Sequence, residues 1–591
     1  MLRDKDLVSI QDARAKVEKA HAAFQQYRRF TQEQVDAIID RMAQVARAHA
    51  GRLAKLAVEE TGYGNVRDKT AKNLLCSDLL HQAIRGLKTV GVVREDPSQK
   101  IIEIAEPVGV VAAILPTTNP TSTAIYKILI ALKGRNTIVL SPHPRAVKCT
   151  CETAALLYQA AREAGAPEDV VQCLENPTLD ATQEIMKHRR TGVILSTGGQ
   201  GIVRAAYSSG KPALGVGPGN VPVLLEHTAD VAQAVKMVVE GKSFDYGTVC
   251  SSEQSLVTEE SLRDQVLAAL KANRAHLCDA AQAAALAKLL ITPDFRVNPA
   301  CVGQAPTKIA QMAGFSVPPE TSILAVELQG MGKEHPLSAE KLSPVLSLFF
   351  VQDWEAALKL CDNLLHFGGL GHTCVIYSND DARIREYGLR MPAMRVLVNT
   401  PAPQGSTGIT TNVFPSMTLG CGAAAGNITS DNIGPLHLIN LKRVAYHVRD
   451  AQSAFTSPEG KAFFSAAPAP SVEQPAAVAA VKSSVADQVE RYLSSRGIAR
   501  EAAPPPPPGA STAQVVDRFL AARRSAQPPA PNAPPNPNPP PPAPPVEVVP
   551  FVSENDVRRA IQQGKKIYIG SKTIVTPAAR DLGADVLVKT D

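Results

Sequence analysis

The side chains of this sequence best suited to nucleophilic chemistry are its cysteines, and one of them stands in an unusual setting. Cys250 follows the turn-forming stretch Gly247-Thr-Val and precedes Ser251-Ser-Glu253. A cysteine attacks a carbonyl carbon only as the thiolate, whereas a free thiol has a pKa of about 8.5. The other cysteines are scattered without a C-x-x-C pair, at positions 76, 149, 151, 173, 278, 301, 361, 374 and 421. This spacing indicates neither a zinc site nor a disulfide framework, and reduced thiols are expected there.

Six further motifs accompany this cysteine within the first 450 residues. They are Pro116–Thr123, Asn136–Pro144, Ser196–Gly199, Gly215–Asn220, Glu340–Val345 and Gly369–Thr373. Together with Gly247–Glu253, in this order and across residues 7–447, they resemble the CoA-acylating branch of the aldehyde dehydrogenase superfamily. Each motif alone is weak, and the ordered set makes the resemblance specific.

The resemblance implies a reaction through a cysteine thioester. Cys250 would attack the aldehyde, and the backbone N–H of Cys250 and the side chain of Asn119 would stabilise the oxyanion. A turn asparagine before Pro120 is the structural alternative for Asn119, and Thr118 competes for its role because the family spacing is one residue shorter. Hydride would pass to a nicotinamide and leave a thioester. His372 is a candidate helper in the thiol step, with a structural histidine as the alternative.

An absent carboxylate favours thiolysis of the thioester over hydrolysis. Hydrolytic relatives carry a Glu-Leu-Gly-Gly-Lys loop whose glutamate activates water, and Gly215 stands at the matching position here. Such a base usually contributes about 10²–10⁴-fold, whereas a thiol depends on it less. The expected product is therefore an acyl-CoA from a short-chain aldehyde such as propionaldehyde or acetaldehyde. A hydrolytic dehydrogenase and a non-catalytic scaffold are the alternatives.

The resemblance also assigns a cofactor and a second substrate. The residues implied to bind the dinucleotide are Thr117, Ser141, Pro142, His143, Thr197, Gly198, Gly199, Val216, Gly217 and Glu340. Glu340 corresponds to a carboxylate that binds the nicotinamide ribose, and the adjacent glycines would let the backbone approach the diphosphate at a helix N-terminus. The general family has a lysine where this chain has Ser141-Pro-His143, which favours NAD over NADP. Coenzyme A is the expected co-substrate, and no metal site is expected.

Alternating strands and helices must position these residues, which predicts an α/β fold with parallel sheets. Strands are predicted at 101–104, 108–115, 137–140, 192–196, 221–225 and 396–399, and helices at 9–27, 32–60, 121–133 and 146–164. The resemblance implies a Rossmann-like NAD/CoA-binding domain over 1–220 with a returning strand in 426–450, and a catalytic domain over 221–425. Residues 95–104 and 436–448 would form oligomerisation strands of a homodimer or homotetramer.

The last 140 residues have a different composition. Pro504–Pro508 is an unbroken proline run, and such segments form extended spacers, so residues 451–591 are predicted to be a flexible Pro-rich tail. Apolar spacing predicts short amphipathic helices near 481–496, 511–524 and 553–563, followed by a β-like stretch over 566–575. The helices near 481–496 and 511–524 resemble encapsulation peptides of bacterial microcompartment enzymes, and residues 566–591 resemble a C-terminal segment of such enzymes. The resemblance implies a shell-protein partner; docking on the chain's own globular body is the alternative.

Bulk composition excludes several other classes. The net charge is +6 over 591 residues without a Lys/Arg block, which argues against nucleic-acid binding. The apolar runs are shorter than the roughly 20 residues of a membrane helix, and the N-terminus lacks a secretory apolar core. A cytoplasmic protein is expected, inside a microcompartment if the resemblance of the tail holds.

Overall fold

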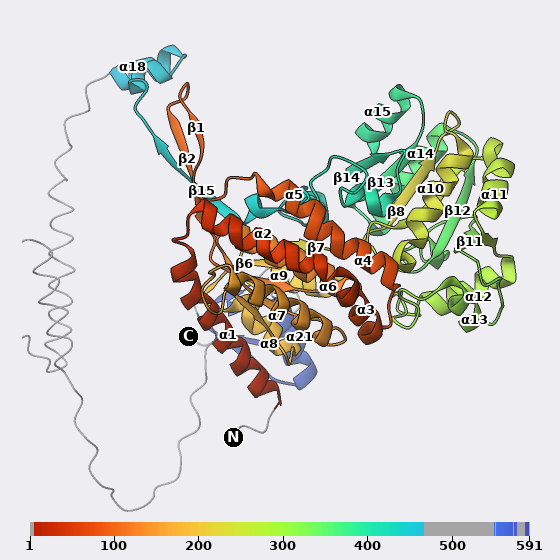
Figure 1. The fold of residues 1–591 in the computed structure, drawn as a ribbon, viewed down its shortest axis with the longest axis horizontal. Coiled ribbons are helices and arrows are strands. Elements are labelled where there is room, and N and C mark those ends of the chain that lie inside the picture. Colours follow the sequence, from red (N-terminus) through yellow and green to blue (C-terminus); the bar gives the residue numbers. More distant parts are fainter. Residues whose placement is uncertain are drawn as a thin grey trace, which may run out of the picture. The chain divides into compact units, whose positions relative to one another are not determined.

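The computed structural model describes residues 5–465, 549, 551–570, 573–575, 579 and 586–589. The chain divides into two compact units, Met1–Ser465 and Ala466–Asp591. Figure 1 shows the first unit as two groups of helices and strands, with a narrow antiparallel ribbon extending from one of them. The mixed α/β architecture with parallel sheets confirms the fold class predicted from the sequence.

A five-stranded parallel sheet forms the core of the first group, in the order β5-β4-β3-β6-β7. Its strands are β3 (Val110–Ile114), β4 (Thr137–Ser141), β5 (Val171–Cys173), β6 (Thr191–Thr197) and β7 (Ala213–Val216). The connecting helices are α6 (Pro120–Lys133), α7 (Val147–Glu163), α8 (Leu179–Lys187) and α9 (Gln200–Tyr207). The strands are runs of buried aliphatic residues, as expected for a sheet covered on both faces.

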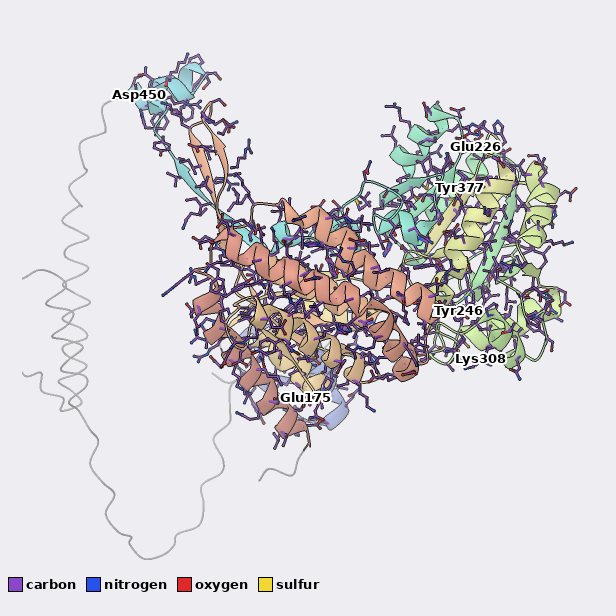
Figure 2. The ribbon with its side chains drawn as sticks, in the orientation of Figure 1. Glu175, Glu226, Tyr246, Lys308, Tyr377 and Asp450 are labelled. Atoms are coloured by element: carbon purple, nitrogen blue, oxygen red, sulfur yellow. The ribbon has the colours of Figure 1, made fainter. Side chains whose placement is uncertain are left out.

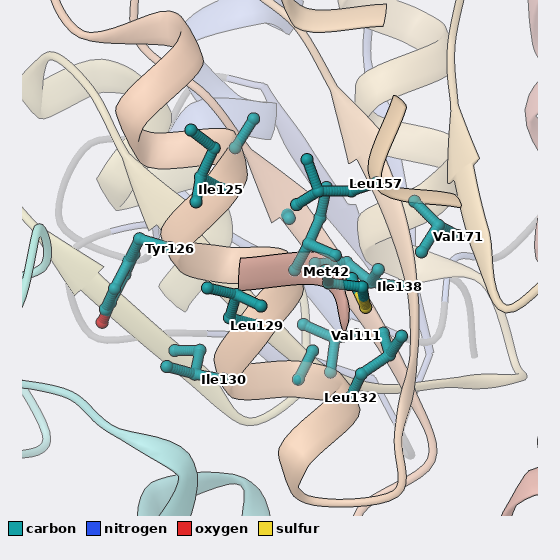
Figure 3. Close-up of a cluster of buried hydrophobic side chains, with 14 of the residues drawn as sticks. Met42, Val111, Ile125, Tyr126, Leu129, Ile130, Leu132, Ile138, Leu157 and Val171 are labelled. Atoms are coloured by element: carbon teal, nitrogen blue, oxygen red, sulfur yellow. The ribbon is translucent and has the colours of Figure 1, made fainter. Parts of the chain in front are cut away.

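Helix α6 lies at the centre of this group. Each of its 14 residues is buried, which fits a helix that is apolar around its whole circumference. Figure 3 shows Ile125, Leu129 and Leu132 of α6 packed beside side chains of neighbouring helices and strands, among them Met42 and Leu157. Since Asn119 immediately precedes α6, this packing fixes the position of the loop that carries it.

The N-terminal helices cover this sheet and correct one prediction. They are α1 (Lys5–Tyr27), α2 (Gln32–Ala48), α3 (Ala50–Thr61), α4 (Val66–Leu74), the π-helical η1 (Leu75–Leu79) and α5 (Leu80–Arg85). The single helix predicted over 32–60 is wrong, because the backbone turns at His49. The break lets the buried face of α2 pack on α6 and α7 while α3 packs on α4. The apolar period continues through the break, so the sequence pattern did not reveal it.

A seven-stranded parallel sheet organises the second group, in the order β10-β11-β12-β9-β8-β13-β14. Its strands are β8 (Val221–Leu225), β9 (Glu253–Glu259), β10 (Ala275–Leu277), β11 (Ile323–Glu327), β12 (Val345–Val351), β13 (Gly371–Tyr377) and β14 (Ala393–Val398). Its helices are α10 (Val231–Ser243), α11 (Arg263–Ala272), α12 (Ala280–Leu290), α13 (Pro306–Met312), α14 (Trp354–Gly368), α15 (Asp381–Arg390) and α16 (Ala402–Ser406). Short helices are η2 (Phe244–Gly247), η3 (Glu260–Leu262), η4 (Pro336–Ser338), η5 (Ala423–Ala425) and η6 (Pro435–Leu438).

The antiparallel ribbon consists of β1 (Gly91–Asp96), β2 (Ile101–Pro107) and β15 (Ile439–Ala445), in that order. It contains the two segments predicted to form oligomerisation strands. Two short helices follow it, α17 (Ala451–Ala454) and α18 (Pro458–Ser465), where Phe455 stacks on Phe464 with ring centroids 4.8 Å apart. The first 15 residues of the predicted tail thus contain two short helices that share this aromatic contact, and the flexibility of the tail stays a prediction.

The second unit contains a small α/β arrangement in its described residues. Strand β16 (Phe551–Val552) pairs with β18 (Ile574–Val575), β17 (Ile567–Ile569) pairs with β19 (Leu587–Lys589), and α21 spans Glu554–Gln563. Ser553 and Asp556 form the capping box of α21, which confirms the helix predicted near 553–563. The helices predicted near 481–496 and 511–524 lie outside the described residues. Across the part of the chain that is described, no helix has the length and apolar character to span a membrane.

Candidate active site

A cavity of about 600 Å³ opens at the carboxyl ends of the first sheet's strands. Residues after β3, β4, β6 and β7 line one side, and the segment before β9 lines another. Ligands of open parallel sheets bind at this edge, where the strand-to-helix loops meet. The position of the cavity therefore follows from the topology.

The cavity brings together twelve of the thirteen predicted site residues. Those that line it are Thr117, Asn119, Ser141, Pro142, His143, Thr197, Gly198, Gly199, Val216, Gly217, Cys250 and Glu340. His372 is absent from the lining and is fully buried. Thr118, the competitor of Asn119, also lines the cavity.

Cys250 is placed by a tight turn between α10 and β9. Asp245, Tyr246 and Gly247 all adopt positive φ angles, of 47°, 53° and 72°. Figure 2 shows Tyr246 at this turn, which lies beside α4. A Cβ on Gly247 would lie 2.6 Å from the carbonyl oxygen of Ser343, so only glycine allows the turn to pack here.

The thiol of Cys250 is protonated at neutral pH in this structure. Its pKa is raised to about 12, chiefly by burial and further by the nearby Glu340 carboxyl, while the Arg395 guanidinium acts in the opposite direction. Burial also raises the pKa of Glu340 to about 7, although the N–H of Gly219 and the ammonium of Lys242 act to lower it. The Gly219 N–H donates to Glu340 Oε1 at 3.2 Å. To react as the predicted nucleophile, this thiol would first have to pass its proton to an acceptor.

Asn119 is held by residues that the sequence analysis missed. Its Oδ1 accepts a hydrogen bond from Lys72 Nζ on α4, and its Nδ2 donates to Thr118 Oγ1 at 3.1 Å. Lys72 also pairs with the buried Asp245. Lys69, one turn earlier on α4, donates to the Thr118 carbonyl at 2.7 Å and pairs with the same carboxylate at 3.0 Å.

One sequence signal could have revealed this cluster. The buried residues of α4 are Lys69, Lys72 and Asn73, so the face of this helix that enters the protein is polar. Two lysines and an asparagine at i, i+3 and i+4 share one side of a helix. A buried face of that kind requires acidic or carbonyl partners elsewhere in the chain.

His372 is buried on strand β13. Its Nδ1 is 2.9 Å from Thr373 Oγ1, and its Nε2 has no hydrogen-bond partner among the described residues. Burial, and then the charge of Arg395, lower its pKa to about 3, so the ring is neutral. A Cβ on Gly219 would lie 3.2 Å from its Cγ, so the ring packs next to Gly219, and neither residue lines the cavity.

The loop before α9 has the features of a diphosphate site. Gly199 is the N-cap of α9 and supplies no side-chain cap, and both Gly198 and Gly199 line the cavity. The first N–H groups of a helix bind anions when no side chain occupies them. A Cβ on Gly199 would meet nothing within 4 Å, so the backbone there is open to a ligand. These residues fit the pyrophosphate of a dinucleotide.

The part of the cavity near the end of β4 is less suited to a phosphate group beyond the diphosphate, such as the 2′-phosphate of NADP. The Ser141 hydroxyl lies 2.8 Å from Thr182 Oγ1 and is engaged there. Burial and the charge of Arg145 lower the pKa of His143, so this imidazole is neutral near pH 7. Arg145 stacks over the Tyr63 ring and donates to its hydroxyl at 3.0 Å. Lysine and arginine are absent from the described residues that line the cavity.

Comparisons with known proteins agree with this geometry. Residues 6–284 match the Aldehyde dehydrogenase family. The chain is 44% identical over 445 residues to the bifunctional aldehyde-alcohol dehydrogenase AdhE of Escherichia coli, a match that covers 74% of this chain and 50% of that protein. It is 36% identical to the succinate-semialdehyde dehydrogenase (acetylating) of Clostridium kluyveri, covering 74% of this chain and 96% of that protein. The chain thus spans about half the length of the first of these relatives and nearly all of the second.

Solved structures give the same result. An acetylating aldehyde dehydrogenase from Geobacillus thermoglucosidasius superposes with a TM-score of 0.75 at 49% identity, covering 76% of this chain and 99% of that one. A propionaldehyde dehydrogenase from the fucose utilisation bacterial microcompartment of Clostridium phytofermentans superposes with a TM-score of 0.66 at 29% identity, covering 73% and 96%. The chain belongs to the aldehyde dehydrogenase family.

Proposed function

We propose that this protein oxidises a short-chain aliphatic aldehyde to its acyl-CoA, with NAD as hydride acceptor and coenzyme A as acyl acceptor. The observation that carries the proposal is one cavity that holds Cys250, Asn119 and Glu340 together with the open backbone before α9. The acetylating relatives support the transfer of the acyl group to CoA.

The chemistry proceeds on Cys250. Its sulfur bonds to the aldehyde carbon, and the thiol proton leaves to an acceptor. Glu340, with a pKa of about 7, is the candidate because it is the one carboxyl group among the described residues that line the cavity. Asn119 Nδ2 and the Cys250 N–H stabilise the oxyanion, and one such donor contributes about 2.7–4 kcal/mol to catalysis. The bound nicotinamide supplies the hydride acceptor. The CoA thiol then attacks the thioester carbon and releases acyl-CoA and the free cysteine.

Thiolysis is supported by the scarcity of carboxylates around the cavity. Among the described lining residues, Glu340 is the one carboxylate. A Cβ on Gly215 would lie 2.9 Å from Val203 Cγ1 and 3.1 Å from the Tyr207 ring, so this position faces α9. A hydrolytic reaction, the alternative, would have to use Glu340 as the base for water as well as for the thiol.

The cofactor assignment follows the lining of the cavity. Thr197, Gly198 and Gly199 would bind the diphosphate, Val216 and Gly217 the nicotinamide, and Glu340 its ribose. Thr117, Ser141, Pro142 and His143 would bind the adenosine side. NAD is favoured over NADP because a neutral His143 and the absence of a lining lysine or arginine offer little to a 2′-phosphate. In this proposal residues 1–220 with 426–450 form the nucleotide domain and 221–425 the catalytic domain.

The aldehyde is expected to be small and uncharged. The cavity walls near the catalytic segment are apolar, with Val302, Leu342, Met417 and Leu419 among them. A carboxylate or sulfonate on the substrate would face these side chains and Glu340 without a cation. Burial of an unpaired charge is strongly unfavourable, so propionaldehyde or acetaldehyde fits this cavity better than an acidic aldehyde.

The location and assembly of the protein are also proposed. The antiparallel ribbon carries exposed Val92, Leu441 and Val444, which suits pairing of subunits in a homodimer or homotetramer. We propose a cytoplasmic enzyme, with the tail directing it to the shell of a bacterial microcompartment. The similarity to an enzyme whose name includes such a compartment supports this. In this proposal His372 serves the thiol step only if its ring gains access to the cavity, whose lining does not include it.

NADH formation from propionaldehyde and NAD, with and without CoA, tests the proposed reaction. The full chain and Cys250→Ala are compared, and the products are identified by mass spectrometry. A CoA-dependent rate that yields propionyl-CoA and disappears in the variant is expected. Propionate formed at a rate indifferent to CoA would overturn thiolysis, and NADH formation that survives Cys250→Ala would overturn the nucleophile.

A further inference from the structure

A buried cluster of two lysines and one aspartate lies beneath the proposed oxyanion site. Asp245 is fully buried, and its Oδ2 accepts from Lys69, Lys72 and Thr248. Lys69 and Lys72 are each 2% exposed and belong to α4, whereas Asp245 belongs to the turn that leads to Cys250. The cluster therefore connects α4 with the nucleophile's turn.

The same cluster contacts Asn119 through Lys72, which does not itself line the cavity. Lys72 Nζ donates to Asn119 Oδ1, and it lies 3.4 Å from Thr248 Oγ1, two residues before Cys250. An ammonium has three donors and no acceptor. It can contact the oxygen of an amide favourably but not its NH₂ group. The contact with Lys72 therefore selects one of the two flipped orientations of the Asn119 side chain.

This orientation determines what Asn119 can offer to a substrate. With Oδ1 turned to Lys72, Nδ2 points the other way; one of its hydrogens is directed to Thr118 Oγ1 at 3.1 Å. Among the described residues Thr118 Oγ1 is the one partner of Nδ2, so its second hydrogen remains available to a ligand of the cavity that Asn119 lines. The reversed orientation would present an oxygen to the developing oxyanion, and two negative oxygens repel each other.

We propose that Lys72 is a positioning residue, which holds the Asn119 amide with its N–H directed at the oxyanion and joins it to the nucleophile's turn through Asp245. The inference rests on the proposed function and adds to it a residue that does not touch the substrate. A hydrogen bond from a charged donor is about twice as strong as a neutral one, so a lysine can hold this orientation firmly.

Removal of the Lys72 charge leaves the rest of the cluster paired. Asp245 keeps the ammonium of Lys69 at 3.0 Å, the hydroxyl of Thr248 at 2.6 Å and the backbone N–H of Asn65 at 2.9 Å. Lys72→Met has a similar length and no donor. Its effect on Asn119 can therefore be measured without an isolated buried charge, which would otherwise dominate the result.

A double-mutant cycle between Lys72→Met and Asn119→Ala tests the inference through kcat for acyl-CoA formation. In Lys72→Met, kcat is expected to fall by at least about tenfold and by no more than the 10²–10³-fold typical of a lost oxyanion donor. The change in KM should be smaller than the change in kcat. If Lys72 acts through Asn119, the double variant should be no slower than Asn119→Ala within about twofold, since coupled sites are not additive. Multiplicative losses, or full activity of Lys72→Met, would overturn the inference.

Two controls separate positioning from folding and from the proposed function. Lys133, at the far end of α6, is also buried and pairs with Asp36 at 2.5 Å, and Lys133→Met should leave kcat unchanged. If Lys72→Met fails to fold, the cycle is run with Lys72→Leu, which also lacks a donor and should give the same non-additivity. A wild-type chain that forms no acyl-CoA would instead refute the proposed function.

Discussion

Replacement of Gly219 by alanine provides a direct test of how closely the protein packs around its nucleophile. The added Cβ would lie 2.2 Å from the carbonyl oxygen of Cys250 and 3.2 Å from Cγ of His372. Close carbon–oxygen contacts in proteins are about 3.3–3.6 Å, so the Cys250 peptide would have to recede by about 1 Å. A displacement of about 1 Å can cost about 10²-fold in rate. This loss corresponds to about 2.7 kcal/mol in the activation barrier.

The assay is kcat for CoA-dependent NADH formation, together with the free energy of unfolding in urea. Gly219→Ala should lose about 10²-fold in kcat, and the overpacking should lower stability by about 1–3 kcal/mol. Gly388→Ala in α15 is the matched control, since a Cβ there meets nothing within 4 Å. It should keep full activity and gain slightly in helix stability. A Gly219→Ala protein with unchanged kcat would refute the reasoning about the nucleophile's position.

Three further outcomes are expected. Alkylation of Cys250 by iodoacetamide, followed by peptide mapping, should accelerate about tenfold per pH unit from pH 7 to 10, because only the thiolate reacts and its pKa is about 12. At pH 8.5 Glu340→Gln should make alkylation of Cys250 faster than in the wild type, since the ionised Glu340 carboxylate raises the pKa of the Cys250 thiol. Equal alkylation rates in the two proteins would contradict this expectation. Oxidised glutathione should form a disulfide between Cys151 and Cys173, whose Sγ atoms are 2.9 Å apart. Closing this loop, with a separation of 22 residues, should raise the free energy of unfolding by about 3 kcal/mol. Two reduced thiols after the treatment would contradict this expectation. Gly215→Glu should lower stability by about 1–3 kcal/mol without producing hydrolysis, because the position faces α9; free acid as product would contradict this.

Short-range features of the fold were predictable. The strands near β4, β6 and β8 and the helices near α6 and α7 were expected within a few residues of their bounds, because apolar period and length are local properties. The capping box of α21 was equally local. The break at His49 was not predictable, since neither neighbouring helix interrupts its apolar spacing.

Motif order predicted which residues meet at the cavity, because the carboxyl ends of parallel strands converge on one edge of a sheet. It did not predict their electrostatics. The proton on Cys250, the pKa of Glu340 near 7 and the neutral His372 arise from burial and from charges on other elements. Desolvation depends on everything that surrounds a group, so no single motif contains it.

The sequence by itself determined the α/β class, the order of the motifs and the identity of the candidate nucleophile. Tertiary structure alone decided that Lys72 meets Asn119 and Asp245, which lie 47 and 173 residues away along the chain. It also decided that His372 packs next to Gly219 and stays outside the cavity lining. The physical reason is that such contacts depend on the close packing of distant elements, whereas residue type and spacing report mainly on each element's own neighbourhood.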